Sequence, residues 1–107
     1  MEKFEIEAIE SWKEDLEFEL KDMEEIEKSL WEEIEVLKIK ISYAEKAATH
    51  VENVEAFTKG RIAPLQVKLS YAEEKLKKVE KENEIKKDQV LALLSKVYKE
   101  IKRHELV

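Results

Sequence analysis

Carboxylates, two histidines and a run of lysines are the side chains in this sequence that could do chemistry. Carboxylates four residues apart on a helix, such as Glu10 and Glu14, could chelate a divalent cation. His50 could act as a pH switch or a ligand, because imidazole titrates near neutrality. The other histidine, His104, is outside its helical reach, and no Glu-x-x-His pattern supplies a carboxylate-bridged centre. We therefore expect no metal site and no cofactor, and we interpret the acidic positions as a solvated helix face.

Motifs for catalysis or phosphate binding are absent from the sequence. It has no cysteine, no Gly-rich loop, no Walker motif and no His-Glu-x-x-His. It also has no serine in a strand-to-helix elbow. We expect a chain that is not an enzyme and that takes no small-molecule substrate.

Lysines are concentrated in one stretch, where they could contact phosphates: Lys75, Lys77, Lys78, Lys81, Lys86 and Lys87. Neither arginine nor an aromatic residue is interleaved, so this hypothesis depends on charge alone. The net charge is -6, and residues 1–35 hold fifteen acidic residues against four lysines. That acidic third would repel a phosphate backbone. Nucleic-acid binding is therefore the weaker hypothesis, and a charged outer face is the stronger one.

Composition predicts helices as the elements that position these side chains. Charged and hydrophobic residues each make up 43% of the chain, with one glycine and one proline, so turn formers are scarce. The same Lys and Glu bias is typical of thermophilic sources and of designed chains. No stretch approaches the roughly 18 consecutive apolar residues of a spanning helix, and the N-terminus lacks a secretion signal. We expect a soluble, cytoplasmic protein with no membrane contact.

Apolar residues recur at steps of three or four from Ile9 to Val51, which places them on one helix face. Those at seven-residue spacing predict a coiled-coil seam: Leu16, Met23, Leu30, Leu37, Ala44 and Val51. A second stripe runs from Leu65 to Ile101 and is interrupted at Asn83, a polar residue that could fix the register of the pairing.

Gly60 and Pro64 predict the turn between the two stripes. We expect helix one over about 3–58, a turn over about 59–63 and helix two over about 64–104. The fold class is all-α: one domain over 1–107, formed by a long antiparallel helical hairpin, a two-helix coiled coil. In this hairpin, residue i faces residue 122 or 123 minus i, which places Val51 near Ala72.

Several alternatives to this hairpin remain. A single helix kinked at Pro64 is one of them. Ser11 with Glu14 has the pattern of a capping box, and a helix start there would leave residues 1–15 as an overhanging arm. Thr49 with Glu52 has the same pattern and could mark a break in helix one.

Helix one carries a second apolar stripe on its other side, formed by Val36, Ile39, Tyr43, Ala47, His50, Val54 and Phe57. A two-helix hairpin cannot cover both stripes, and an exposed apolar area of this extent indicates a contact. We expect a homodimer, an antiparallel four-helix bundle with its two-fold axis near Ala47 and Tyr43 near His50 of the second copy. The alternative covers are the 1–15 arm and another protein.

Residues 37–45 and 65–73 resemble each other closely. They read Leu-Lys-Ile-Lys-Ile-Ser-Tyr-Ala-Glu and Leu-Gln-Val-Lys-Leu-Ser-Tyr-Ala-Glu, with an offset of 28 residues, or four heptads. Duplication and convergence on helix-forming residues both account for this echo.

These patterns predict a non-catalytic coiled-coil interaction protein that self-associates as an assembly scaffold, adaptor or spacer. A nucleic-acid-associated helical module using the lysines of 75–87 and a holdase-like chaperone using exposed apolar ends are the alternatives. The long-hairpin plan resembles the tRNA-binding arms of some synthetases and the tentacles of prefoldin-like chaperones. The arms are usually basic, and the tentacles need strands that this sequence does not contain.

Overall fold

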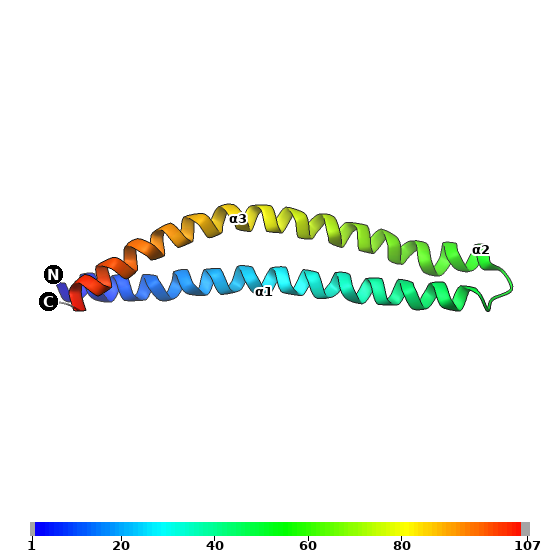
Figure 1. Ribbon diagram of the computed structural model, residues 1–107, viewed down its shortest axis with the longest axis horizontal. Helices are drawn as coiled ribbons and strands as arrows, with labels where there is room; N and C mark the ends of the chain where they lie inside the picture. Colours follow the sequence, from blue (N-terminus) through cyan, green and yellow to red (C-terminus); the bar gives the residue numbers. More distant parts are fainter. Residues whose placement is uncertain (1, 106–107) are drawn as a thin grey trace. The chain divides into compact units, whose positions relative to one another are not determined.

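The computed structural model describes residues 2–105, and its elements are helical. Helix α1 spans Glu2–Ala48, a short helix α2 spans Val54–Phe57, a π-helix η1 spans Thr58–Ile62, and α3 spans Ala63–Glu105 (Figure 1). The part of the chain described here contains no strand. The all-α helical hairpin is therefore confirmed. No helix in this range is both long and apolar enough to cross a membrane.

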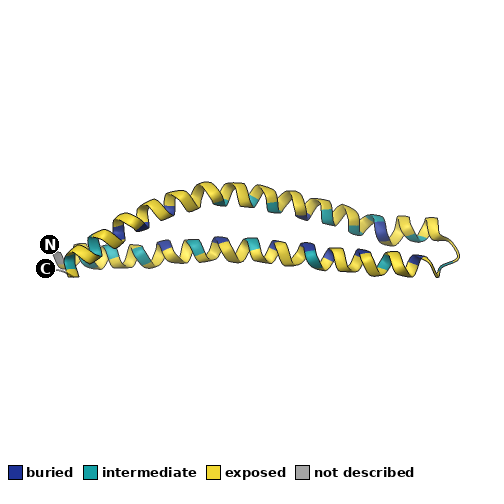
Figure 2. Cartoon of the chain, viewed as in Figure 1, coloured by how far each residue is buried: buried dark blue, intermediate teal, exposed yellow. Residues whose placement is uncertain are grey.

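The contacts divide the hairpin into two compact units. Unit 1 pairs the start of α1 (to residue 26) with the end of α3 (from residue 81), and unit 2 comprises residues 27–80, with the turn. In each unit the two long helices run antiparallel. Figure 2 shows buried residues recurring at intervals along α1, with exposed residues between them, as a coiled-coil seam requires.

The core of unit 1 follows the predicted stripes. Its buried residues form one cluster: Leu16, Met23, Val90, Leu94 and Val97. Ile9, Leu20 and Ile101 pack against that cluster. Asn83 lies on the same face of α3 and donates a hydrogen bond from Nδ2 to the Met23 carbonyl oxygen at 3.5 Å. This bond links the two helices of unit 1 at the position where the sequence places a polar residue in the seam.

The core of unit 2 joins the two echo segments. Ile34, Leu37 and Ala72 are buried together, and Leu65, Leu69 and Leu76 pack against them. Leu37 belongs to the first echo segment, whereas Leu65, Leu69 and Ala72 belong to the second. Leu37 of the first echo segment therefore packs across the seam with residues of the second segment.

The turn lies ten residues earlier than the sequence predicts. Helix α1 ends at Ala48, where the Thr49 hydroxyl donates to the Lys46 carbonyl oxygen at 2.8 Å. Residues 49–53 form the turn, and the side-chain oxygen of Asn53 accepts a hydrogen bond from the Ala56 N–H at 3.0 Å. Asn53 thus caps α2, satisfying a donor that a helix start leaves without a partner. The expected extension of helix one to about residue 58 is wrong.

The predicted turn over about 59–63 is also wrong, because those residues are helical. The Ala63 N–H donates to the Thr58 carbonyl oxygen five residues back, the hydrogen bond of a π-helix. Gly60 does not take the left-handed conformation, since no described residue has a positive φ. Pro64 lies in the first turn of α3, just after the π-helix. Because η1 continues into α3 without a break, Pro64 removes one backbone donor from a continuous run of helix, and the chain remains helical through it.

The earlier turn changes which residues meet. Ala72, expected opposite Val51, packs instead with Ile34 and Leu37. The overhanging arm is also wrong for the described residues, because α1 continues through Ser11 and Ile9 packs against the unit 1 core. Met1 lies outside the described residues.

Candidate interaction surface

Three large apolar residues of α1 in unit 2 point away from the seam. Val36, Ile39 and Tyr43 are 48%, 55% and 66% exposed, and Ala47 is exposed as well. Leu37 and Ile41 occupy the seam on the opposite side of the same turns, because a helix repeats every 3.6 residues. The hairpin therefore leaves the first four residues of the predicted interface uncovered.

The other three residues of that stripe are not on α1. His50 is exposed in the turn, Val54 is half-exposed in α2, and Phe57 is partly buried at the end of α2. Because α1 ends at Ala48, the seven residues do not share one helix face. The expected pairing of Tyr43 with His50 along a single face therefore loses its geometric basis.

Helix α3 contributes two residues that the sequence reasoning missed. Val67 and Tyr71 are each 69% exposed. They hold the same places in the second echo segment as Ile39 and Tyr43 hold in the first, so the echo was the signal that could have found them. In the heptad register of this seam, Tyr43 and Tyr71 hold equivalent positions on the same side of the antiparallel pair, whereas Ile39 and Val67 lie directly opposite the seam, each on the outer side of its own helix. We call Val36, Ile39, Tyr43, Val67 and Tyr71 the outer face of unit 2.

Charge distinguishes this unit from the other. Unit 2 contains ten acidic and ten basic residues, which gives a net charge of zero, whereas unit 1 contains sixteen acidic and ten basic residues, which gives -6. On the outer face, the Lys46 ammonium lies 4.9 Å from the centre of the Tyr43 ring, a cation–π contact. The outer face therefore belongs to an electrically balanced unit, and one of its rings already interacts with a cation.

Ion pairs within the described residues connect neighbouring turns of one helix. Glu100 lies 3.2 Å from the Lys96 ammonium and 3.7 Å from the Arg103 guanidinium. The hydrogen bond and charge of Lys96, with the charge of Arg103 beside it, hold the pKa of the Glu100 carboxyl below its ordinary value. Lys13 pairs with Glu17 at 3.9 Å in the same way. Exposed pairs of this kind contribute little to stability.

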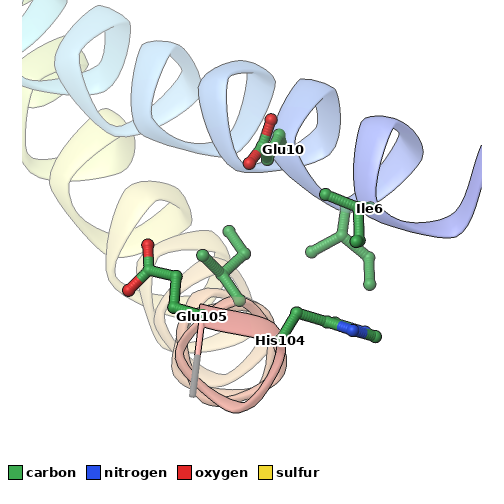
Figure 3. Close-up of a pocket in the computed structure, with 6 residues that line it drawn as sticks. Ile6, Glu10, His104 and Glu105 are labelled. Atoms are coloured by element: carbon green, nitrogen blue, oxygen red, sulfur yellow. The ribbon is translucent and has the colours of Figure 1, made fainter. Parts of the chain in front are cut away.

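A shallow hollow in unit 1 is the other candidate site. Ile6, Ile9 and Ile101 line it, with Glu10, His104 and Glu105 around them. Figure 3 shows the polar ends of Glu10, His104 and Glu105 pointing in different directions rather than toward one point. Among residues 2–105, no group of three or more acidic or histidine side chains could hold a metal ion. The hollow therefore has no convergent chemistry.

The lysines of 75–87 lie on α3 and are all exposed. Glu80, Glu82 and Glu84 are interleaved with them and are exposed as well. This mixed surface is less suited to a phosphate backbone than a run of lysines alone would be.

No protein-family model, curated protein or solved structure matches the chain. The geometry of its own residues is therefore the basis for a functional conclusion. The outer face of unit 2 can bury apolar side chains against another surface.

Proposed function

We propose that this chain is a non-catalytic helical hairpin that self-associates through the outer face of unit 2 and serves as an assembly scaffold or spacer. The observation that supports this proposal most directly is the exposure of Val36, Ile39, Tyr43, Val67 and Tyr71 outside the seam of unit 2. Tyrosines next to aliphatic residues are common anchors in protein interfaces, because they bury a large area at low cost in conformational entropy.

A second copy of the chain is the partner that the charges favour. Unit 2 is neutral, so two copies can approach through it without net repulsion. Unit 1 carries -6, so two copies of unit 1 repel each other. Contact between copies is therefore directed toward unit 2, and a two-fold arrangement buries the same face on both chains.

Sedimentation equilibrium on a pair of adjacent substitutions tests this proposal. Tyr43→Glu places a charge in the proposed interface, where burying it without a partner is costly. Ser42→Glu makes the same change in charge about 100° around the helix, at another exposed position. We expect the wild type and Ser42→Glu to dimerise at micromolar concentration, and Tyr43→Glu to be a helical monomer.

A monomeric wild type, or a Tyr43→Glu chain that dimerises as strongly as Ser42→Glu, would contradict the proposed interface. Two further measurements separate the other functions. Binding to tRNA or DNA that weakens with salt would identify a nucleic-acid module. Suppression of the aggregation of an unrelated unfolded protein would identify a holdase.

A further inference from the structure

The heptad pattern of the unit 2 sequence continues through the turn in the same register. In the sequence, alternating steps of three and four residues connect the seam positions of α1 with those of α3. In the hairpin, the π-helix η1 takes up one extra residue within this series, so a continuous seam also requires η1 to become α-helical. The series is Ile34, Leu37, Ile41, Ala44, Ala48, Val51, Glu55, Thr58, Ile62, Leu65, Leu69 and Ala72. A hairpin does not need this continuity, because a turn can join two helices in any phase. One uninterrupted helix does need it.

The turn itself contains nothing that prevents a helix. Residues 49–53 read Thr-His-Val-Glu-Asn, without glycine or proline. No described residue has a positive φ, so the turn depends on no left-handed residue that would have to change sign. The chain is helical on both sides of it, since α1 ends at Ala48 and α2 begins at Val54.

The echo supplies matching surfaces for an exchange. Leu37 of the first echo segment packs with the second segment of the same chain, and the two segments have nearly the same residues at corresponding positions. If residues 49–53 became helical, the chain would no longer fold back on itself. Both segments would then lose the contacts that they make within the hairpin. A second extended chain, running antiparallel, would offer each of them the same contacts again.

We infer that residues 49–53 are a hinge, and that two copies of this chain can exchange their α3 segments and re-form the unit 2 seam between chains. This inference goes beyond the proposed function, because it uses the seam and not the outer face. Domain exchange of this kind preserves the native contacts and replaces only the hinge and the π-helical turn η1.

Two residues oppose the exchange. Asn53 caps α2 in the hairpin, and a continuous helix would lose that cap. Glu55 is exposed in α2 but holds a seam position in the continuous series, where its carboxylate would be buried near the two-fold axis. We therefore expect Asn53→Ala and Glu55→Leu to favour the exchanged dimer, each for a different physical reason.

Cross-linking between differently marked chains tests the inference, because the protein has no cysteine of its own. Leu37→Cys and Ala72→Cys are made in separate chains, since these positions share the unit 2 core. Both chains also carry Tyr43→Glu, which removes association through the outer face. They are unfolded together, refolded, and treated with a short bismaleimide. A covalent dimer of the two chains requires exchange, because unexchanged hairpins keep the two introduced cysteines in different molecules.

We expect cross-linking to trap that covalent dimer as a minor product of refolding, because Tyr43→Glu chains are monomeric at equilibrium. Asn53→Ala should favour it about fivefold per chain, the factor that corresponds to the loss of a typical cap. Asn53→Ser keeps a capping oxygen and should leave the yield unchanged. One chain with both cysteines should cross-link internally. If that chain cross-links and the mixed chains do not, even with Asn53→Ala, the exchange is refuted. If it does not cross-link, the seam pairing on which the exchange depends is refuted.

Sedimentation equilibrium without any cysteine provides an independent measurement. Glu55→Leu in the Tyr43→Glu background should dimerise where Tyr43→Glu alone is monomeric. A monomer in both cases would contradict the exchange and leave the outer-face proposal untouched. Conversely, a wild type that dimerises only by exchange would contradict the outer face alone.

Discussion

Gly60 is the one glycine of the chain, yet its backbone does not use the freedom that glycine offers. Its φ is not positive, and a Cβ built on it would meet nothing within 4 Å. A glycine in a helix loses more conformational entropy on folding than any other residue. This position is therefore a source of instability that no contact explains.

Gly60→Ala should stabilise the protein by about 0.4 to 1 kcal/mol, because alanine reduces the entropy of the unfolded chain and fits the space. Urea unfolding followed by circular dichroism measures the change. Ala63→Gly, the reverse substitution three residues later, is the control and should destabilise by a similar amount. A destabilising Gly60→Ala would show that the backbone there requires glycine.

Glu100 should make stability depend on pH. Its pKa is lowered in the folded chain, first by the hydrogen bond from Lys96. A lowered pKa stabilises the fold above the unfolded value of about 4.3, and this contribution is lost as the pH falls through the folded pKa. Glu100→Gln should therefore lower the urea midpoint at pH 7, and the difference from the wild type should vanish near pH 2. A difference that stays the same from pH 7 to pH 2 would contradict this contribution.

At the scale of the elements, substitution of two adjacent leucines of α3 shows how much the seam contributes to the stability of the fold. Leu94 is 3% exposed in the unit 1 core, whereas Leu93 is 40% exposed. Leu94→Ala should cost about 2 to 3 kcal/mol, because it removes buried methyl groups and leaves a cavity. Leu93→Ala should cost about 1 kcal/mol or less. Thermal unfolding decides the comparison, and equal losses at both positions would mean that the register of α3 differs from the one described.

The apolar periodicity was sufficient to predict the helices and the seam. Leu16, Met23, Leu30 and Leu37 are buried, as their seven-residue spacing predicts. The position of the turn did not follow from this periodicity, although the alternative break at Thr49 with Glu52 is confirmed, because α1 ends at Ala48. Gly60 and Pro64 are strong general signals for a helix end, whereas the cap at Asn53 contributes only about 1 kcal/mol and has many equivalents in a polar sequence.

The predicted interface stripe was partly wrong because the turn was predicted ten residues too late. Exposure of Val36, Ile39 and Tyr43 could be predicted, because residues opposite a seam must point outward. The last part of the stripe, from His50 onward, was assigned to a helix that ends at Ala48. Val67 and Tyr71 belong to the other helix, and their match to Ile39 and Tyr43 in the echo was the signal that could have found them.

For the whole molecule, the uneven charge controls how copies approach one another. The net charge of -6 arises in unit 1, while unit 2 is balanced. Like charges repel over a Debye length of about 10 Å at 0.1 M salt, and less at higher salt. Self-association through unit 2 should therefore strengthen as salt rises from about 0.05 to 0.5 M.

Sedimentation equilibrium across that range tests the salt prediction. Association that weakens with salt would indicate attraction between opposite charges at the interface, and the apolar outer face would not explain it. Lys3→Glu adds to the acidic charge of unit 1 and should make the dependence on salt steeper.

The π-helix at Thr58–Ile62 has the form of a single-residue insertion in the helix. Its hydrogen bond joins Ala63 to Thr58, five residues apart, whereas an α-helix joins residues four apart. Removing Gly60 would shorten this turn to an ordinary α-helical one and let Ala63 still bond to Thr58.

The same deletion would be harmful to an extended chain, because every seam position before residue 60 would rotate by about 100° relative to those after it. A one-residue deletion should therefore leave the hairpin as stable as before, or more stable, while abolishing exchange between copies. For this one variant, thermal unfolding should show an undiminished hairpin stability, and cross-linking between chains should show that exchange is lost. The extra residue thus allows one sequence to form both the hairpin and the extended helix. Deleting it should leave only the hairpin.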